Sequence, residues 1–118
     1  MKIMERSQYL DKLKRLKGTP DIKVITGVRR SGKSKLMDSY IGWIEDKEKD
    51  ANIIYIDFTS LQFEELKEYH ALNKYVEERY QRGKNNYLFI DEVQMCPQFE
   101  LTINSLHSAE KYDICYGF

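Results

Sequence analysis

Prolines, cysteines and long apolar runs are scarce in this 118-residue sequence, which has two prolines and two cysteines. No stretch approaches the ~20 apolar residues that a membrane-spanning helix needs. Charged residues interrupt the N-terminal stretch MKIMERSQYLDKLKRLKG every two or three positions, so it lacks the apolar centre of a secretory signal peptide. We therefore expect a cytoplasmic protein with no membrane partner.

The cysteines and the charge balance exclude further classes. Cys96 and Cys115 are not in C-x-x-C spacing, and reduced thiols are favoured over a disulfide in a cytoplasmic protein. The 19 lysines and arginines equal the 19 aspartates and glutamates, so the formal net charge is zero. No global positive field attracts nucleic acid, although a local basic patch is compatible with this balance. A nucleic-acid partner therefore stays undetermined.

The residues that are present suit a folded domain. Hydrophobic residues make up 42% and charged residues 32%, enough apolar material for a core. A length of 118 residues is that of one domain or of part of a larger protein.

Apolar β-branched runs alternate with helical patterns along the chain. Strands are predicted at 22–26, 52–58, 87–93 and 112–116. Helices are predicted at 5–17, at 33–46, over a stretch that is clearest at 72–80 and ends at Gly83, and after Cys96-Pro97. This alternation predicts βαβ crossovers and an α/β fold with a mostly parallel sheet. The run at 22–26, IKVIT, is predicted to be buried on both faces.

The stretch GVRRSGKS, residues 27–34, fits the G-x-x-x-x-G-K-[ST] pattern of a phosphate-binding loop. It lies between a predicted strand and a predicted helix, as such a loop requires. Gly27 and Gly32 can adopt backbone angles closed to other residues and keep side chains away from the phosphates. The amides from about Arg29 to Ser34 can then point toward the phosphates at the positive end of the helix.

Two residues of this loop add side-chain chemistry. Lys33 offers a compact charge for the β and γ phosphates of ATP, and the Ser34 hydroxyl is a candidate Mg²⁺ ligand. Arg29 and Arg30 occupy variable positions and are interpreted as solvated loop charges rather than catalytic groups. The predicted nucleotide-binding residues are Gly27, Arg29, Arg30, Ser31, Gly32, Lys33 and Ser34.

Asp91 and Glu92 follow the apolar run YLFI. In an open parallel sheet, ligands bind at the carboxyl ends of the strands, where the glycine loop also lies. Asp91 is therefore the predicted metal-binding carboxylate. Glu92 is the predicted catalytic carboxylate, which would polarise a water for attack on the γ-phosphate. Lys33 is the second predicted catalytic residue.

Other polar residues carry weaker predictions. His70 and His107 lack metal-ligand spacing with the cysteines, and solvated or satisfied histidines are favoured. Asp57, at the end of the 52–58 run, could face the site or could cap the next segment.

The basic helix at 5–17 is interpreted as a packing helix with a solvated face. The alternative is that Arg6, Lys14 or Arg15 approaches a ligand or nucleic acid.

The motifs IKVITGVRRSGKS, IIYIDF and YLFIDEVQ, and the INSL helix followed by KYDI, together resemble the N-terminal part of a prokaryotic AAA-domain ATPase family of the AAA+ superfamily. The resemblance implies a P-loop NTPase fold of three αβα layers. Residues 27–34 match its Walker A loop, and Asp91 and Glu92 match its Walker B positions. It further implies ATP and Mg²⁺ as cofactors, and oligomers of the full-length protein that share an arginine finger.

The sequence departs from the family pattern after KYDI, where relatives typically read I-T-G-S and this chain reads CYGF. We therefore expect a partial nucleotide-binding domain at 21–118, truncated after about four strands and without the lid and the C-terminal domain. Residues 1–20 are expected to form an N-terminal helix that leads into this domain. If the usual AAA+ strand order applies, the run at 22–26 lies at an open edge of the sheet.

The function expected by resemblance is ATP binding, with Mg²⁺-dependent hydrolysis in the intact protein. Two alternatives stay open. One is a P-loop kinase for a small acceptor, and the other is a catalytically inactive nucleotide-binding or interaction module.

Overall fold

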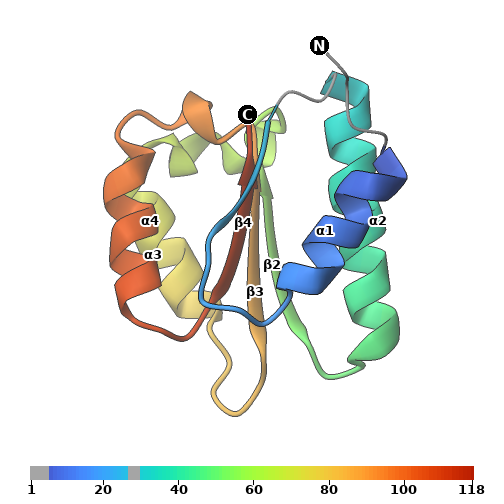
Figure 1. Ribbon diagram of the computed structural model, residues 1–118. Helices are drawn as coiled ribbons and strands as arrows, with labels where there is room; N and C mark the ends of the chain where they lie inside the picture. The colour runs from blue at the N-terminus through green and yellow to red at the C-terminus, as the bar shows by residue number, and fades with distance from the viewer. Residues whose placement is uncertain (1–5, 27–29) are drawn as a thin grey trace.

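Four parallel strands form the centre of the protein, and helices cover both faces (Figure 1). The computed structural model describes residues 6–26 and 30–118. The strands are β1 (Lys23–Ile25), β2 (Asn52–Asp57), β3 (Asn86–Asp91) and β4 (Asp113–Gly117). Their order in the sheet is β1-β4-β3-β2. The parallel sheet is confirmed, and β1 lies at an edge, as expected.

Helices lie on both faces of the sheet (Figure 1). α1 (Arg6–Leu16) and α2 (Arg30–Lys47) cover one face, and α3 (Tyr69–Arg79) and α4 (Phe99–Ser108) cover the other. Short 3₁₀ helices, η1 (Leu61–Lys67) and η2 (Val93–Met95), follow β2 and β3. This three-layer αβα arrangement confirms the predicted fold class.

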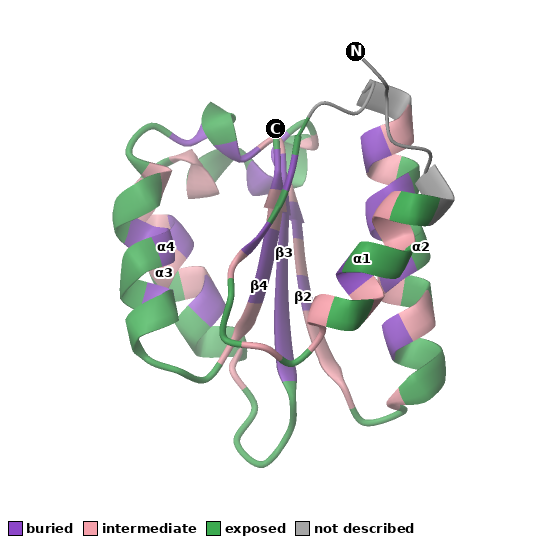
Figure 2. Ribbon diagram, viewed as in Figure 1, coloured by how far each residue is buried: buried purple, intermediate pink, exposed green. Residues whose placement is uncertain are grey.

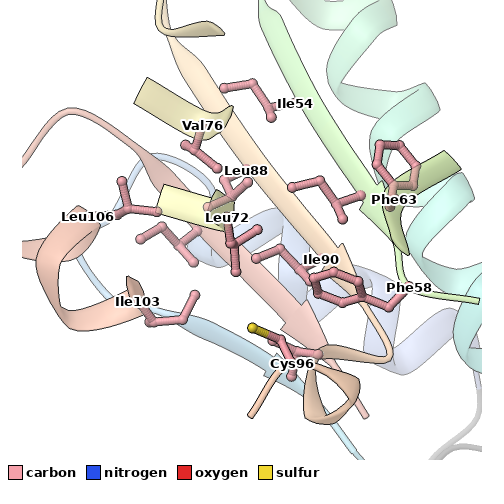
Figure 3. Close-up of a cluster of buried hydrophobic side chains, with 13 residues drawn as sticks. Ile54, Phe58, Phe63, Leu72, Val76, Leu88, Ile90, Cys96, Ile103 and Leu106 are labelled. Carbon is pink, nitrogen blue, oxygen red and sulfur yellow. The ribbon is translucent and has the colours of Figure 1, made fainter. Parts of the chain in front are cut away.

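Each helical layer has its own apolar core. Ile54, Leu72, Leu88 and Ile103 belong to the cluster under α3 and α4, whose side chains converge in Figure 3. Leu36, Met37, Tyr40 and Ile44 recur at helical spacing on α2 and pack on the opposite face of β3. All six residues of β3 are buried because helices cover both of its faces (Figure 2).

The edge strand differs from the prediction. Ile25 is fully buried, but Val24 is 40% exposed, so the prediction that 22–26 is buried on both faces was wrong. Val24 and Ile25 point to opposite faces, and β1 lies at the end of the strand order, where the helices cover less of the sheet. Lys23 is buried despite its charge because its Nζ lies 2.8 Å from Asp113 Oδ1.

Several element boundaries also differ from the predicted ranges, most of them by one residue and three of them by more. α3 ends at Arg79, and the chain reverses through Gly83 with φ +84°. The strand predicted at 87–93 ends at Asp91, because Glu92 adopts a left-handed conformation. α2 begins at Arg30, three residues before the predicted start.

The cysteines and the apolar character of the helices complete the description of the fold. Cys96 and Cys115 are both free and buried, as expected. Within the parts of the chain that the structure describes, no helix combines the length and the apolar character needed to cross a membrane.

Candidate functional site

The carboxyl ends of the strands meet in register at one edge of the sheet. Asp57 pairs with Asp91 across β2 and β3, and Asp91 pairs with Gly117 across β3 and β4. Gly117 in turn pairs with Ile25 of β1, two residues before the glycine loop. The first turn of α2 lies at the same edge, at the top of Figure 1. This topology brings together side chains that are about 60 residues apart in the sequence.

Lys33 contacts both carboxylates that follow the third strand. Its Nζ lies 3.1 Å from Asp91 Oδ1 and donates a hydrogen bond to Glu92 Oε1. The side chains of Lys33 and Asp91 are each only 3% exposed, so the ion pair is shielded from water. We call the group of Lys33, Ser34, Asp91 and Glu92 the carboxylate cluster. The structure thus brings the predicted Walker A and Walker B residues into contact.

Ser34 completes this cluster. Its Oγ donates a hydrogen bond of 3.0 Å to Asp91 Oδ2. Asp91 Oδ1 is buried, and the partner that the described residues give it is Lys33 Nζ at 3.1 Å. A buried carboxylate oxygen with an incomplete set of partners has free capacity for a cation.

The electrostatics of the cluster favour charged Lys33. Burial alone would lower its pKa, but hydrogen bonds to Glu92 and Asp91 outweigh it, and the pKa is raised. The negative charges at the carboxyl ends of the strands also act on Tyr55 of β2. Burial, followed by the charges of Asp91 and Asp57, raises the pKa of Tyr55 to about 12. The lysine therefore carries a positive charge in a field of carboxylates.

Glu92 reaches Lys33 because of an unusual backbone conformation. Its φ of 57° and ψ of 47° are left-handed, which costs a non-glycine residue about 1 kcal/mol. The turn is closed by the bond from Met95 N to Glu92 O at 3.1 Å. Gln94 Nε2 donates to Glu92 Oε2 at 2.6 Å and so orients the carboxylate. Strained backbone of this kind clusters at functional sites.

Asp57 takes the second of its two predicted alternatives. Its Oδ1 accepts hydrogen bonds from the backbone N and the Oγ1 of Thr59, at 3.0 and 2.7 Å. Asp57 therefore caps the turn after β2, although its charge still acts on Tyr55.

The remaining predicted residues of the glycine loop are described only in part. Gly27 and Arg29 lie outside the described residues, and the structure places Arg30 and Ser31 in the first turn of α2 by their backbone alone. Gly32 is half-buried on α2. The nucleotide-binding role of these five positions stays a prediction.

Three of the weaker candidates contact partners that are not part of the carboxylate cluster. His70 Nδ1 is 3.0 Å from Glu68, and His107 Nε2 is 2.7 Å from the Pro20 carbonyl oxygen. Lys14 packs over the ring of Trp43, with 5.3 Å between Nζ and the ring centroid, which supports its interpretation as part of a packing helix. Among the residues that the structure covers, no group of three or more metal-ligating side chains forms a metal site by itself.

A cavity of about 640 Å³ lies at the opposite end of the strands, where β3 and β4 begin. Its lining includes Asn86 and Asp113, the first residues of β3 and β4. Because the cluster is at the carboxyl ends of these strands, this cavity is separate from it.

Sequence reasoning missed two residues of the site. Gln94 was part of the quoted DEVQ motif but received no role, and its contact with Glu92 depends on the turn at η2. Gly117 lies beside Lys33, and only the register of β4 against β3 shows this.

The family model for an AAA domain matches residues 19–116, which is most of the chain. The chain belongs to the AAA domain family. This AAA domain is 32% identical over 114 residues to a Haemophilus influenzae protein that is described only as uncharacterized. The match covers 95% of this chain but 28% of that relative. The comparison with solved structures found no match to this chain. The family assignment indicates nucleotide binding, and the activity of the longer relative is a separate question.

Proposed function

We propose that this AAA domain binds Mg²⁺-ATP at the carboxylate cluster, and that the intact protein hydrolyses it. The observation that carries the proposal is the contact of Lys33 with Asp91 and Glu92 at the carboxyl ends of the strands. A phosphate-binding site of this kind uses a lysine and a serine at the start of a helix, together with a carboxylate at the end of a neighbouring strand. The AAA family match is independent support.

The residues present fit a magnesium ion. Mg²⁺ takes hard oxygen ligands and usually needs one or two protein ligands together with waters and substrate phosphates. Ser34 Oγ and the incompletely satisfied carboxylate of Asp91 are such ligands, and they are already in contact. When bound, the ion would neutralise charge on the phosphates.

The protein's own residues have distinct roles in this proposal. Lys33 exchanges its carboxylate partners for the β and γ phosphates of ATP. Glu92, held by Gln94, accepts a hydrogen bond from the attacking water and draws its proton away. Amides at the N-terminus of α2 face the phosphates. We further propose that Gly27, Arg29, Arg30, Ser31 and Gly32 form the rest of the phosphate loop.

Two substitutions test these roles. Lys33→Ala is expected to abolish ATP binding, because it removes the charge that the phosphates need. Glu92→Gln is expected to keep binding and to lower turnover of the full-length protein at least about 100-fold, the contribution typical of a general base. Binding is measured by isothermal titration with ATP and Mg²⁺, and turnover by phosphate release. Equal loss of binding in both variants would contradict these roles.

Measuring ADP formation together with phosphate release separates hydrolysis from phosphoryl transfer. ATP consumption that requires an added small acceptor would favour a kinase. Consumption in water alone is the result expected here.

A further inference from the structure

Gly117 is the last residue of β4, and the side chain of Lys33 passes directly over it. A Cβ placed on Gly117 would lie 3.0 Å from Lys33 Cδ and 3.4 Å from Lys33 Cγ. Carbon atoms in ordinary contact are about 3.5 to 4.0 Å apart. The strand partners of Gly117 are Asp91 and Ile25, so Lys33 crosses β4 on its way from α2 to the end of β3.

The Lys33 side chain has little freedom to move away from a new methyl group. Its backbone is held in α2, and its Nζ is held by Asp91 and Glu92. The side chain is only 3% exposed, so neighbouring atoms surround it. The Ile25 carbonyl oxygen lies 3.4 Å from the same Cβ position and limits movement of β4 toward β1.

The need for glycine at this position is one of space. Gly18 and Gly83 have positive φ angles, whereas the backbone of Gly117 is one that any residue can adopt. Apart from its chain neighbours and the backbone of its own helix, Gly42 in α2 has no atom of the described residues within 4 Å of a Cβ position, and it offers a matched control.

We infer that Gly117 is a positioning residue of the nucleotide site, because its missing side chain gives Lys33 the path across β4 that presents the ammonium group at the end of β3. The consequence for ATP rests on the proposed function. The steric relation to Lys33 stands apart from it, and the two are tested separately.

The first experiment is a double-mutant cycle on stability without nucleotide. Gly117→Ala is expected to lower the melting temperature of the protein. In a Lys33→Ala background the same change is expected to leave the melting temperature unchanged or to raise it, because Cγ and Cδ are gone. Gly42→Ala is expected to change the melting temperature by the same amount in both backgrounds. An identical loss from Gly117→Ala in both backgrounds would overturn the inference.

Lys33→Ala leaves Asp91 buried without its cation and could prevent folding. In that case the cycle is run on a Lys33→Ala/Asp91→Asn background, which removes the uncompensated charge. The expected coupling between positions 33 and 117 is the same.

The second experiment measures ATP affinity by titration with Mg²⁺ present. Gly117→Ala is expected to weaken ATP binding about tenfold, since a displaced Lys33 loses a charged hydrogen bond to phosphate, whereas Gly42→Ala is expected to bind like the wild type. If the wild type binds ATP and Gly117→Ala binds it equally well, the inference fails. If the wild type does not bind ATP but the stability cycle shows coupling, the proposed function fails and the positioning of Lys33 by Gly117 stands.

Discussion

Backbone conformation at single residues decides what several side chains of this protein can reach. Glu92, Gln98 and Glu110 all have positive φ angles although none is glycine. At Glu92 the left-handed turn directs the carboxylate to Lys33, so the strain is linked to the site. Sequence patterns identified Lys33, Ser34, Asp91 and Glu92 because each belongs to a motif of residue types. They could not identify Gly117 or the role of Gln94, which depend on strand register and on one turn.

Backbone conformation also predicts opposite effects of one substitution at two glycines. Beyond the local chain, the described residues place no atom within 4 Å of a Cβ position at Gly42 or Gly83. Gly83 has φ +84°, whereas Gly42 lies in α2. Gly83→Ala is expected to lower the free energy of unfolding by about 1 kcal/mol, and Gly42→Ala to raise it by about 0.5 to 1 kcal/mol. Urea unfolding measures both. A change of the same sign at both positions would mean that conformational preference does not control these sites.

At the scale of the elements, Glu48 connects the ends of two helices to a strand through hydrogen bonds, at the end of the sheet opposite the carboxylate cluster. It follows α2, and its carboxylate accepts from Lys17 Nζ at 2.5 Å, from Asn85 Nδ2 at 2.6 Å and from the Tyr87 hydroxyl. Lys17 comes just after α1, and Tyr87 belongs to β3. Burial alone would raise the pKa of Glu48, but the hydrogen bonds from Lys17, Tyr87 and Asn85 lower it to about 2.

This network predicts a pH-dependent contribution to stability. The folded-state pKa of Glu48 is below its ordinary value of 4.5, so its contribution is complete above that value and is lost as the pH falls toward about 2. Glu48→Gln is expected to lower the free energy of unfolding by about 2 kcal/mol at pH 7, with the difference from the wild type vanishing near pH 2. Denaturant unfolding of both proteins at pH 7, 4 and 2 measures this difference. A difference that stays constant over this range would show that the Glu48 charge does not contribute.

The positions of the helices and strands were largely predictable because apolar residues recur with a different period in a helix than in a strand. Short apolar runs, partly β-branched, identified the four strands, and helical spacing identified α1, α2, α3 and α4. The ends were less predictable. β3 stops at Asp91 because of the Glu92 turn, and α3 stops at Arg79, where Tyr80 becomes extended. Both ends depend on local conformations that the apolar pattern does not encode.

At the scale of the whole molecule, the sheet joins two separate cores to one site. β3 contributes Leu88 and Ile90 to the core under α3 and α4, and Tyr87 and Phe89 to the core under α1 and α2. The same strand ends in Asp91, so packing on both faces fixes the position of the carboxylate. Alternation of strands and helices predicted the layers. The exposure of Val24 was missed, because an apolar run does not reveal how far helices cover an edge strand.

The packing of the site strand in both cores makes global stability a readout of nucleotide binding. A ligand that binds only the folded protein stabilises it by about 2.7 kcal/mol at 100 times its dissociation constant. Saturating ATP with Mg²⁺ is therefore expected to raise the melting temperature by about 10 °C for a domain of this size. Adenosine, which has no phosphates, is expected to give no shift, and Lys33→Ala is expected to give none with ATP. Because the carboxylate cluster lies where both cores meet the strand ends, its occupation opposes unfolding of the whole domain. An unchanged melting temperature at millimolar Mg²⁺-ATP would instead favour an inactive module, in which Lys33 serves only to neutralise Asp91 and Glu92.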